Sequence, residues 1–316
     1  MFASPKALAA KGVLGMNKRN IDYIGRYNPR RLYKFVDDKL STKQLAIDNN
    51  IHSPGLIGVI SQQHDIAMVP KLVQGKSGFV VKPAQGSGGK GIMVITKVKD
   101  GRFYKPNGDE ITHEEMTRHV SNTLSGLFTL GGKPDVAMIE ELIQFDPVFD
   151  GFSFEGVPDI RLIIFKGFPV MGMLRLSTKA SDGKANLHQG AVGVGLDLAN
   201  GQGLYAVQFD RKVEYHPDTG RKLNEIKVPH WDKLLHLAAG CYEMSGLGYL
   251  GTDMVLDVEH GPLLLELNAR PGLAIQIAND QGILPRLKQI EALGEQNMDV
   301  EQRIAYSKKH FSTAHA

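Results

Sequence analysis

A glycine-rich stretch at residues 82–92, Lys-Pro-Ala-Gln-Gly-Ser-Gly-Gly-Lys-Gly-Ile, has the composition of a loop that can hold phosphate groups. Backbone N–H groups of such a loop can fold around phosphate oxygens, and the lysine at its start adds a positive charge. The glycines at 86, 88 and 91 have the spacing of a dinucleotide-binding loop and of a kinase glycine loop. Dinucleotide and Walker loops lead into a helix, whereas Ile-Met-Val-Ile predicts a strand here, and the kinase segments His-Arg-Asp and Asp-Phe-Gly do not occur. We therefore expect a hairpin tip that covers phosphates, with a hairpin that binds nothing as the alternative.

Two carboxylates and an amide occur in a second stretch, at Asp253, Glu266 and Asn268. A hairpin that turns at His260-Gly261 would pair Asp253 with Asn268 and Val255 with Glu266. Side chains alternate between the two faces of a strand, so the three polar side chains would share one face. The opposite face would carry the apolar side chains of Met254, Leu256, Leu265 and Leu267. Oxygen ligands with room for water and phosphate suit Mg²⁺, and the alternative is the ordinary solvent-facing side of a hairpin.

Helices and strands of mixed order must position these two stretches. We expect a helix at residues 41–49 with Ser41 as its N-cap, and a helix at 112–128 that begins with a capping box. A further helix is expected at 231–244. Strands are predicted at residues 79–82, 92–96, 136–143, 159–165, 170–177, 252–259 and 263–268, and residues 178–203 are predicted to be loop-like in part. Because strands and helices do not alternate regularly, the predicted fold class is α+β with antiparallel sheets.

The composition of the chain narrows the function classes. Its 316 residues, 42% of them hydrophobic, can form one large domain or two ordinary ones. The single cysteine, Cys241, excludes an intramolecular disulfide and a thiolate zinc cluster, and we expect a packed core thiol in a reducing, cytoplasmic compartment. No segment is predicted to span a membrane or to act as a signal peptide.

The first 43 residues hold ten basic and three acidic residues, which predicts a solvated basic arm or a surface for an acidic partner. Nucleic acid is not expected as a partner, because no nucleic-acid motif is present.

Residues 38–273 are similar, in order, to the ATP-grasp superfamily. The segment Asp-Lys-Leu-Ser-Thr-Lys resembles the one with the first phosphate-binding lysine, here Lys39, and Lys82 resembles the second. The glycine-rich lid of the superfamily falls on Gly86, Ser87, Gly88, Gly89 and Gly91. The stretch Met-Ile-Glu-Glu-Leu-Ile resembles the hinge strand that borders adenine. The resemblance implies contacts to the base, largely through the backbone, from Glu140, Glu141, Leu142 and Ile143.

The resemblance continues in the second half of the chain. Asp159-Ile-Arg161 resembles a strand whose aspartate lies toward the ribose and whose arginine lies toward phosphate. Asn186-Leu-His188 resembles a loop of the glutamate-adding branch. Asp253, Glu266 and Asn268 fall on the magnesium ligands of the superfamily, and Arg270-Pro-Gly-Leu follows as it does in that branch. The greatest likeness is to the alpha-L-glutamate ligases, which include ribosomal-protein glutamate ligases, and among them to the sugar-transfer-associated ATP-grasp group.

This resemblance implies a fold in which two α+β lobes with antiparallel sheets grip ATP between them. The domains would be a basic arm at residues 1–38, an N-lobe with the lid at 39–143 and a C-lobe with the magnesium hairpin at 144–316. Most relatives carry a full α/β domain before the first lysine, whereas only 38 residues precede Lys39 here. The arm or a second subunit could supply the missing wall of the substrate site, so a homo-oligomer is compatible with the sequence.

The activity implied is ADP-forming ligation of a carboxylate to an amine through an acyl-phosphate, with ATP and Mg²⁺ (or Mn²⁺) as cofactors. The product would be an amide or peptide bond, for example through addition of glutamate to a peptide, protein or metabolite. Arg161, Arg175 and Arg270 would stabilise the transferring phosphoryl group or hold the substrate carboxylate, with an ordinary surface strand residue as the alternative for Arg175. His188 could act as a base or be an ordinary loop histidine. The alternatives are a non-catalytic ATP-responsive module and a small-molecule kinase.

Overall fold

The computed structural model describes residues 4–86, 88–295 and 297–313, and the chain forms two compact units. The glycine-loop unit consists of residues 37–47 and 53–144. The seven-stranded unit consists of the residues before 37, residues 48–52 and the residues from 145 onward. The chain therefore enters the glycine-loop unit twice and returns to the seven-stranded unit each time.

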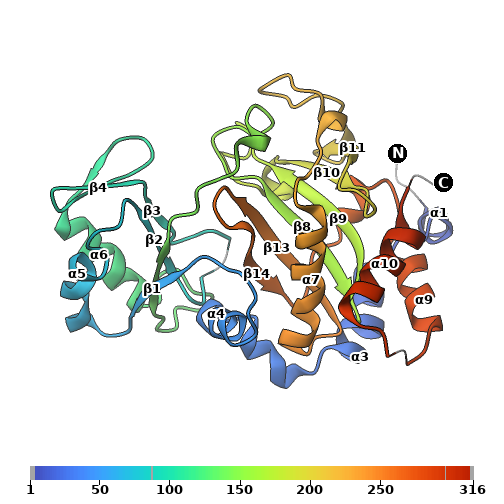
Figure 1. The fold of residues 1–316 in the computed structure, drawn as a ribbon, viewed down its shortest axis with the longest axis horizontal. Helices are drawn as coiled ribbons and strands as arrows, with labels where there is room; N and C mark the ends of the chain where they lie inside the picture. Colours follow the sequence, from blue (N-terminus) through green and yellow to red (C-terminus); the bar gives the residue numbers. More distant parts are fainter. Residues whose placement is uncertain (1–3, 87, 296, 314–316) are drawn as a thin grey trace. The chain divides into compact units, whose positions relative to one another are not determined.

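Two antiparallel sheets form the glycine-loop unit (Figure 1). The first has the strand order β1-β7-β2-β3, with β1 at Leu56–Ile60, β7 at Ala137–Glu141, β2 at Phe79–Pro83 and β3 at Met93–Ile95. The second consists of β4 (Lys97–Lys99), β5 (Arg102–Tyr104) and β6 (Glu110–Ile111). The helices are α4 (Lys39–Asp48), a 3-10 helix at Gln63–Met68, α5 (Val69–Leu72) and α6 (His113–Leu124).

Local sequence signals account for the two elements that matter most in this unit. The capping box of α6 is present, because the Thr112 hydroxyl accepts from the backbone N–H of Glu115 and the Glu115 carboxylate accepts from the backbone N–H of Thr112. In β2, Phe79 and Val81 are buried in the core of the unit. Side chains alternate along a strand, so Lys82 lies on the face opposite that core.

A seven-stranded antiparallel sheet, in the order β12-β11-β10-β9-β8-β13-β14, forms the centre of the other unit. Its strands are β8 (Asp159–Phe165), β9 (Phe168–Leu176), β10 (Val192–Leu196), β11 (Gly203–Gln208), β12 (Arg211–Lys212), β13 (Tyr249–Asp257) and β14 (Gly261–Asn268). The larger helices are α7 (Trp231–Ser245), α9 (Leu284–Ala292) and α10 (Val300–Phe311). Shorter helical turns are α8 (Ile275–Ala278) and the 3-10 helices Pro147–Phe149, Leu187–Gln189 and Leu223–Glu225.

Helix α7 covers one face of this sheet and leaves the other face for charged side chains. Gly172 of β9 pairs with Leu162 of β8, and a side chain at Gly172 would meet both Leu162 and Trp231 of α7. Arg161 precedes Leu162 in β8, so its side chain points to the opposite face. The charged residues described below therefore share the face that α7 does not cover.

The N-terminal residues pack on the seven-stranded unit and do not extend into solvent as a separate arm. They form α1 (Pro5–Ala10), α2 (Met16–Lys18), a π-helix at Arg19–Ile24, α3 (Gly25–Tyr27) and a 3-10 helix at Arg30–Phe35. The buried Asn28 amide donates to the carbonyls of Tyr249 and Ala269, at 2.7 and 3.0 Å, and accepts from the N–H of Tyr249 at 2.8 Å. The Tyr27 ring meets the edge of Phe165 at 4.9 Å. This segment is therefore an integral part of the unit.

The predicted fold class is confirmed, since all the described strand pairs are antiparallel. One local prediction needs correction. Helix α4 begins at Lys39, and its capping bond comes from Asp38 instead of Ser41, since the Asp38 carboxylate accepts from the N–H of Ser41 at 2.8 Å. The region 178–203, predicted to be loop-like in part, contains one strand, β10, between irregular segments. Among the described helices, none combines the length and the apolar character needed to cross a bilayer.

Candidate functional site

The hairpin of β13 and β14 carries the expected polar residues, but in a different register. Asp253 pairs with Glu266, and Gly251 pairs with Asn268. The predicted pairs of Asp253 with Asn268 and of Val255 with Glu266 are therefore wrong. Pairing across the strands still places Asp253 and Glu266 on one face, and Asn268, two residues beyond Glu266, lies on the same face. The shared face is thus present, although it is built from other pairs.

An extra residue in β14 sets this register. Asp253 pairs with Glu266 while Met254 pairs with Leu264, so Leu265 forms a bulge between them. Leu264, which is 2% exposed, takes the core position that the sequence predicted for Leu265. A bulge bends the strand and cannot be located from alternation alone, because alternation assumes an unbroken ladder.

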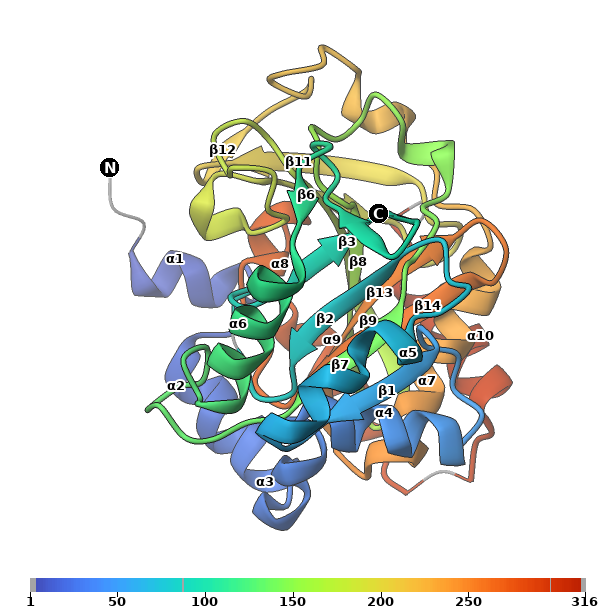
Figure 2. The same ribbon diagram turned by 90° about the vertical axis from the view of Figure 1, so that its left-hand side faces the viewer.

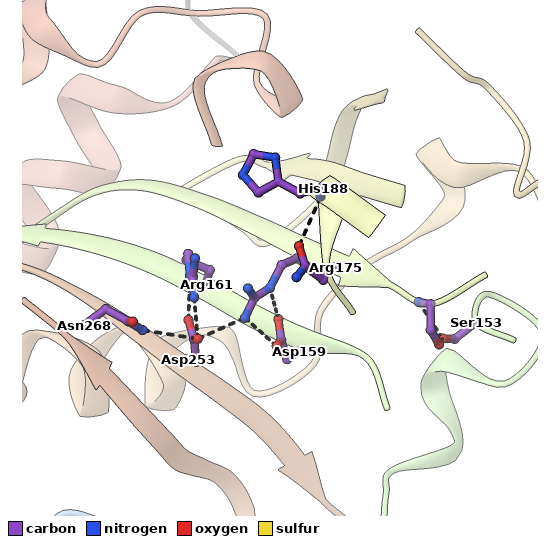
Figure 3. A network of polar contacts seen from close by, with 9 residues as sticks. Ser153, Asp159, Arg161, Arg175, His188, Asp253 and Asn268 are labelled. Carbon is purple, nitrogen blue, oxygen red and sulfur yellow. Dashed lines mark hydrogen bonds and ion pairs between the residues drawn. The ribbon is translucent and has the colours of Figure 1, made fainter. Parts of the chain in front are cut away.

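Asp253 is the central acceptor of this face (Figure 3). Arg161, its direct neighbour on β8, donates from Nε at 2.6 Å and from Nη2 at 2.5 Å to the two carboxylate oxygens. Asn268 Nδ2 donates to Asp253 Oδ2 at 3.3 Å. Burial opposes ionisation of Asp253, but Arg175 and Arg161 together hold the pKa of its carboxyl below the ordinary value. Asp253 is therefore an ionised carboxylate inside a buried ion network.

A second ion pair extends this network across the sheet. Arg175 of β9 pairs in register with Asp159 of β8, and its Nε and Nη2 both bond to the Asp159 carboxylate. Arg175 Nη2 also lies 3.0 Å from Asp253 Oδ2, so this guanidinium joins the two carboxylates. Burial raises the pKa of Asp159 to about 6, and Asp253 adds to this effect while Arg175 opposes it. Two arginines and two aspartates thus form one continuous row.

The other predicted residues of this unit lie around the row with different surroundings. Glu266 is half-buried opposite Asp253. The Arg270 guanidinium stacks over the Tyr33 ring at 5.2 Å. Asn186 Oδ1 accepts from the backbone N–H of His188 at 3.1 Å, and His188 itself is exposed. Asn186 therefore shapes the turn that presents His188.

The donor set of the hairpin fits Mg²⁺ by its chemistry. Asp253, Glu266 and Asn268 offer only oxygen ligands, once the Asn268 amide turns its oxygen toward the ion. The described residues contain no group of three or more histidine, cysteine, aspartate or glutamate side chains placed to hold a metal. A magnesium site here thus needs the amide and additional oxygens from water or phosphate, which is typical of this ion.

The two predicted lysines lie in the glycine-loop unit. Lys39, at the start of α4, donates from Nζ to the carbonyl of Gly86 at 2.7 Å, and its backbone N–H donates to the carbonyl of Ala84 at 2.9 Å. Lys82 Nζ forms an ion pair with Glu140 Oε2. Lys39 is therefore in contact with the base of the glycine loop, and Lys82 is held by the carboxylate of the hinge strand.

Glu140 has a role that the sequence did not indicate. Its side chain is buried and forms a second ion pair, with Lys43 Nζ at 2.9 Å from Oε1. Lys43 also donates to the carbonyl of Pro54 at 2.5 Å. Burial lowers the pKa of Lys43, the nearby Lys82 lowers it further, and Glu140 opposes both. One carboxylate thus organises two buried ammonium groups, and Lys43 is a residue of this site that sequence reasoning missed. The signal available was its position four residues after Lys39, one helical turn further along α4.

The remaining hinge residues lie at the end of β7. Glu141 is the last residue of the strand, its N–H donates to the carbonyl of Gly55 at 2.8 Å, and its carboxylate pairs with Lys76 at 2.7 Å. Leu142 and Ile143 follow the strand, so their backbone groups lie beyond the ladder with β2.

The glycine loop needs glycine at several positions. Gly88, Gly89 and Gly91 have positive φ values of 63°, 75° and 78°, a region that other residues rarely adopt. A side chain at Gly91 would also meet the Phe128 ring. The Gly91 carbonyl is 3.0 Å from His119 Nε2, and Gly86 forms a bridge with Thr129. Ser87, also predicted as a lid residue, lies outside the described residues.

The chain belongs to the sugar-transfer associated ATP-grasp family, which its sequence matches over residues 18–292. This region includes all the candidate site residues described above. A probable alpha-L-glutamate ligase from Ectopseudomonas mendocina (strain ymp) is 24% identical over 238 residues, which cover 75% of this chain and 56% of that relative. The chain therefore spans little more than half the length of this curated relative.

Solved structures of ATP-grasp ligases are also similar. The ATP-grasp ligase PsnB complexed with a minimal precursor matches with a TM-score of 0.47 and 13% identity, over 85% of this chain and 63% of PsnB. D-alanyl-alanine synthetase A from Vibrio cholerae O1 biovar eltor matches with a TM-score of 0.47 and 10% identity, over 88% of this chain and 66% of that structure.

Proposed function

We propose that the chain is an ATP-dependent ligase that joins a carboxylate to an amine and releases ADP and phosphate. The observation that carries this proposal is the buried row of Arg161, Asp253 and Arg175 beside Glu266. Two guanidinium groups next to two carboxylates suit a reaction that moves a phosphoryl group between oxygens. Membership of the ATP-grasp family supports the same reaction class.

The proposed reaction has two steps. An oxygen of the acid attacks the γ-phosphorus of ATP, the bond to the β-phosphate oxygen breaks, and an acyl-phosphate and ADP form. The amine then attacks the acyl carbon, phosphate leaves, and the amine loses a proton to give the amide. The reaction asks the protein mainly for positioning and charge neutralisation.

The residues divide this work between them. Lys39 and Lys82 would hold phosphate oxygens, with Glu140 and Lys43 fixing the position of Lys82. Mg²⁺ held by Asp253, Glu266 and Asn268 would supply neutralisation of charge on the phosphates, and Mn²⁺ has the same ligand preference. Arg161 and Arg175 would stabilise the transferred phosphoryl group, and Arg270 the substrate carboxylate.

The remaining residues would make further contacts to ATP. We propose that Leu142 and Ile143 contact the adenine base through their backbone, next to Glu140 and Glu141, and that Asp159 lies toward the ribose. The glycine loop would close over the phosphates and exclude water that would otherwise hydrolyse the acyl-phosphate. His188, which is exposed in the turn that Asn186 shapes, could take up the proton that the amine loses.

The test is ADP release with panels of acids and amines in the presence of Mg²⁺ or Mn²⁺. Glu266→Ala should lower turnover by about 10²-fold or more. Glu259→Ala, which removes an exposed carboxylate from the turn of the same hairpin, should leave it unchanged. A stable phosphorylated acid formed without any amine would indicate a kinase instead. Nucleotide binding without turnover of any pair would indicate an ATP-responsive module.

A further inference from the structure

A pocket of about 890 Å³ lies within the seven-stranded unit. One wall comes from residues 8–19 of the N-terminal segment, a second from residues 187–191 with β11 and the turn after it, and a third from residues 272–282. In Figure 2, α1 lies beside α8, below the turn between β11 and β12. His188 and Gly272 both line the pocket, so it is continuous with two stretches that also carry proposed site residues.

Hydrogen bonds to the backbone of the N-terminal segment fix this wall of the pocket in place. The buried side chain of Gln276 accepts from the N–H of Leu14 at 2.8 Å and donates to the Leu14 carbonyl at 3.1 Å. The N–H of Leu284 donates to the Gly12 carbonyl at 3.1 Å. Gly282 packs so closely that a side chain there would lie 2.0 Å from the Gly12 backbone. The pocket is therefore formed before any ligand arrives, which lowers the entropic cost of binding.

The lining of the pocket exposes large apolar side chains. Leu8, Met16, Phe209 and Ile277 are 40%, 66%, 59% and 43% exposed, and all four line this one hollow. Single exposed apolar residues are common on protein surfaces, but several around one concavity indicate a ligand site. A volume of this size lies in the range of about 300–1,000 Å³ that is usual for small-molecule sites.

Charged residues of both signs accompany the apolar lining. Lys11 and Arg19 belong to the N-terminal wall, whereas Asp210 and Asp280 belong to the other two walls. Arg19 Nη1 donates to the carbonyl of Pro271, the residue after Arg270, at 2.8 Å, and Nε and Nη2 donate to Asn20 Oδ1. These bonds use three of the five N–H groups of a guanidinium, and a carboxylate could accept from the others.

We propose that this pocket binds the acid substrate, and that this acid is a short peptide with apolar side chains. Its carboxylate would be held by Arg19, next to Arg270 and the magnesium hairpin, and its ammonium group by Asp210 or Asp280. The apolar side chains would cover Leu8, Met16, Phe209 and Ile277. This inference rests on the proposed function, and it assigns the N-terminal segment as one wall of the substrate site.

The experiment is a calorimetric titration of the full chain with leucyl-leucine, in the presence of a non-hydrolysable ATP analogue and Mg²⁺. Three related probes each lack one feature: leucyl-leucinamide lacks the carboxylate, N-acetyl-leucyl-leucine lacks the ammonium group, and glycyl-glycine lacks the apolar side chains. Each should bind at least tenfold more weakly than leucyl-leucine. Equal affinity for all four probes, or no binding of leucyl-leucine, would overturn the proposal.

Two variants locate the binding to this pocket. Arg19→Met should weaken leucyl-leucine binding by about tenfold to a hundredfold. The same variant should bind leucyl-leucinamide as the unmodified protein does, because the interacting carboxylate is already missing. Lys18→Met removes a neighbouring cation that pairs with Asp22 at 3.1 Å and does not line the pocket, so it should change neither affinity. Loss of affinity in Lys18→Met to the same extent as in Arg19→Met would contradict the assignment.

Nucleotide binding and ADP release separate this inference from the proposed function. Arg19→Met should bind the ATP analogue with unchanged affinity, which also shows that the variant is folded. Peptide binding without ADP release for any amine would refute the ligase but keep the pocket. ADP release with other acids, together with no binding of leucyl-leucine, would refute the pocket assignment but keep the ligase.

Discussion

Replacement of Glu140 by glutamine should destabilise the glycine-loop unit strongly. Glu140 pairs with Lys43 at 2.9 Å and with Lys82, and the Lys43 and Lys82 side chains are only 6% and 12% exposed. At 2.9 Å, two unit charges attract each other by about 6 kcal/mol if the effective dielectric constant is about 20. Desolvation offsets part of this attraction, and removal of one partner of a buried pair typically costs about 3–5 kcal/mol. We expect the free energy of unfolding to fall by that amount at neutral pH.

The loss should depend on pH in a defined direction. Burial lowers the folded-state pKa of Lys43 below its ordinary value of 10.5, so between these two values the unfolded state binds more protons. In that window the free energy of unfolding rises with pH. Glu140→Gln removes the carboxylate that opposes this lowering of the Lys43 pKa. The pKa then falls further, so the rise in the free energy of unfolding begins at a lower pH. The destabilisation caused by the variant should therefore shrink as the pH rises.

Urea unfolding followed by far-UV circular dichroism measures both effects, with Glu141→Gln as the matched control. Glu141 also pairs with a lysine, Lys76, at 2.7 Å, but these side chains are 46% and 41% exposed. An exposed pair contributes about 1 kcal/mol or less, so the control should change little. Equal losses in the two variants would refute the reasoning that burial makes the Glu140 pairs important.

Three further predictions follow from other parts of the chain. The folded-state pKa of Asp159 is about 6 and its ordinary value is 3.8, so this residue adds stability as the pH falls from the first value to the second. Asp159→Asn should remove this gain from urea unfolding curves measured between these pH values. A difference in the free energy of unfolding between the two proteins that does not change with pH would contradict this. Gly91→Ala should lower the melting temperature more than Gly89→Ala, since both glycines have positive φ but only a side chain at Gly91 would meet Phe128, at 2.5 Å; equal melting temperatures would count against it. Cys241 is fully buried, and burial raises the pKa of its thiol. An aromatic disulfide reagent should therefore label this thiol no faster than the protein unfolds. Rapid labelling of the native protein would disprove the core position.

Local signals in the sequence predicted much of this fold. The glycine loop between β2 and β3 and the capping box at Thr112 depend on neighbouring residues only, and both are present. The shared face of Asp253, Glu266 and Asn268 was predicted for a similar reason, because alternation along each strand decides which side chains share a face.

The features that could not be predicted depend on contacts between distant residues. The bulge at Leu265 shifted the pairing of the hairpin, and nothing near Leu265 marks it. The pairing of Lys43 with Glu140 joins residues that are nearly a hundred positions apart. The attachment of the N-terminal segment depends on Gln276, whose amide bonds to Leu14 from 262 positions away. Such partners become visible only when the strands and helices have been placed.

The division of the chain between the two units has a consequence for its synthesis on the ribosome. All the strands of the glycine-loop unit, from β1 to β7, are complete once Glu141 has been translated, so this unit can fold while the rest is still being made. The seven-stranded unit cannot fold at that stage, because Asn28 bonds to Tyr249 and Ala269, which have not yet been translated. Ala269 follows β14. Until then the aromatic side chains around Tyr27 are exposed in the nascent chain, where chaperones that recognise apolar segments can bind them. Truncation before β14 should therefore leave a folded glycine-loop unit attached to an unfolded remainder.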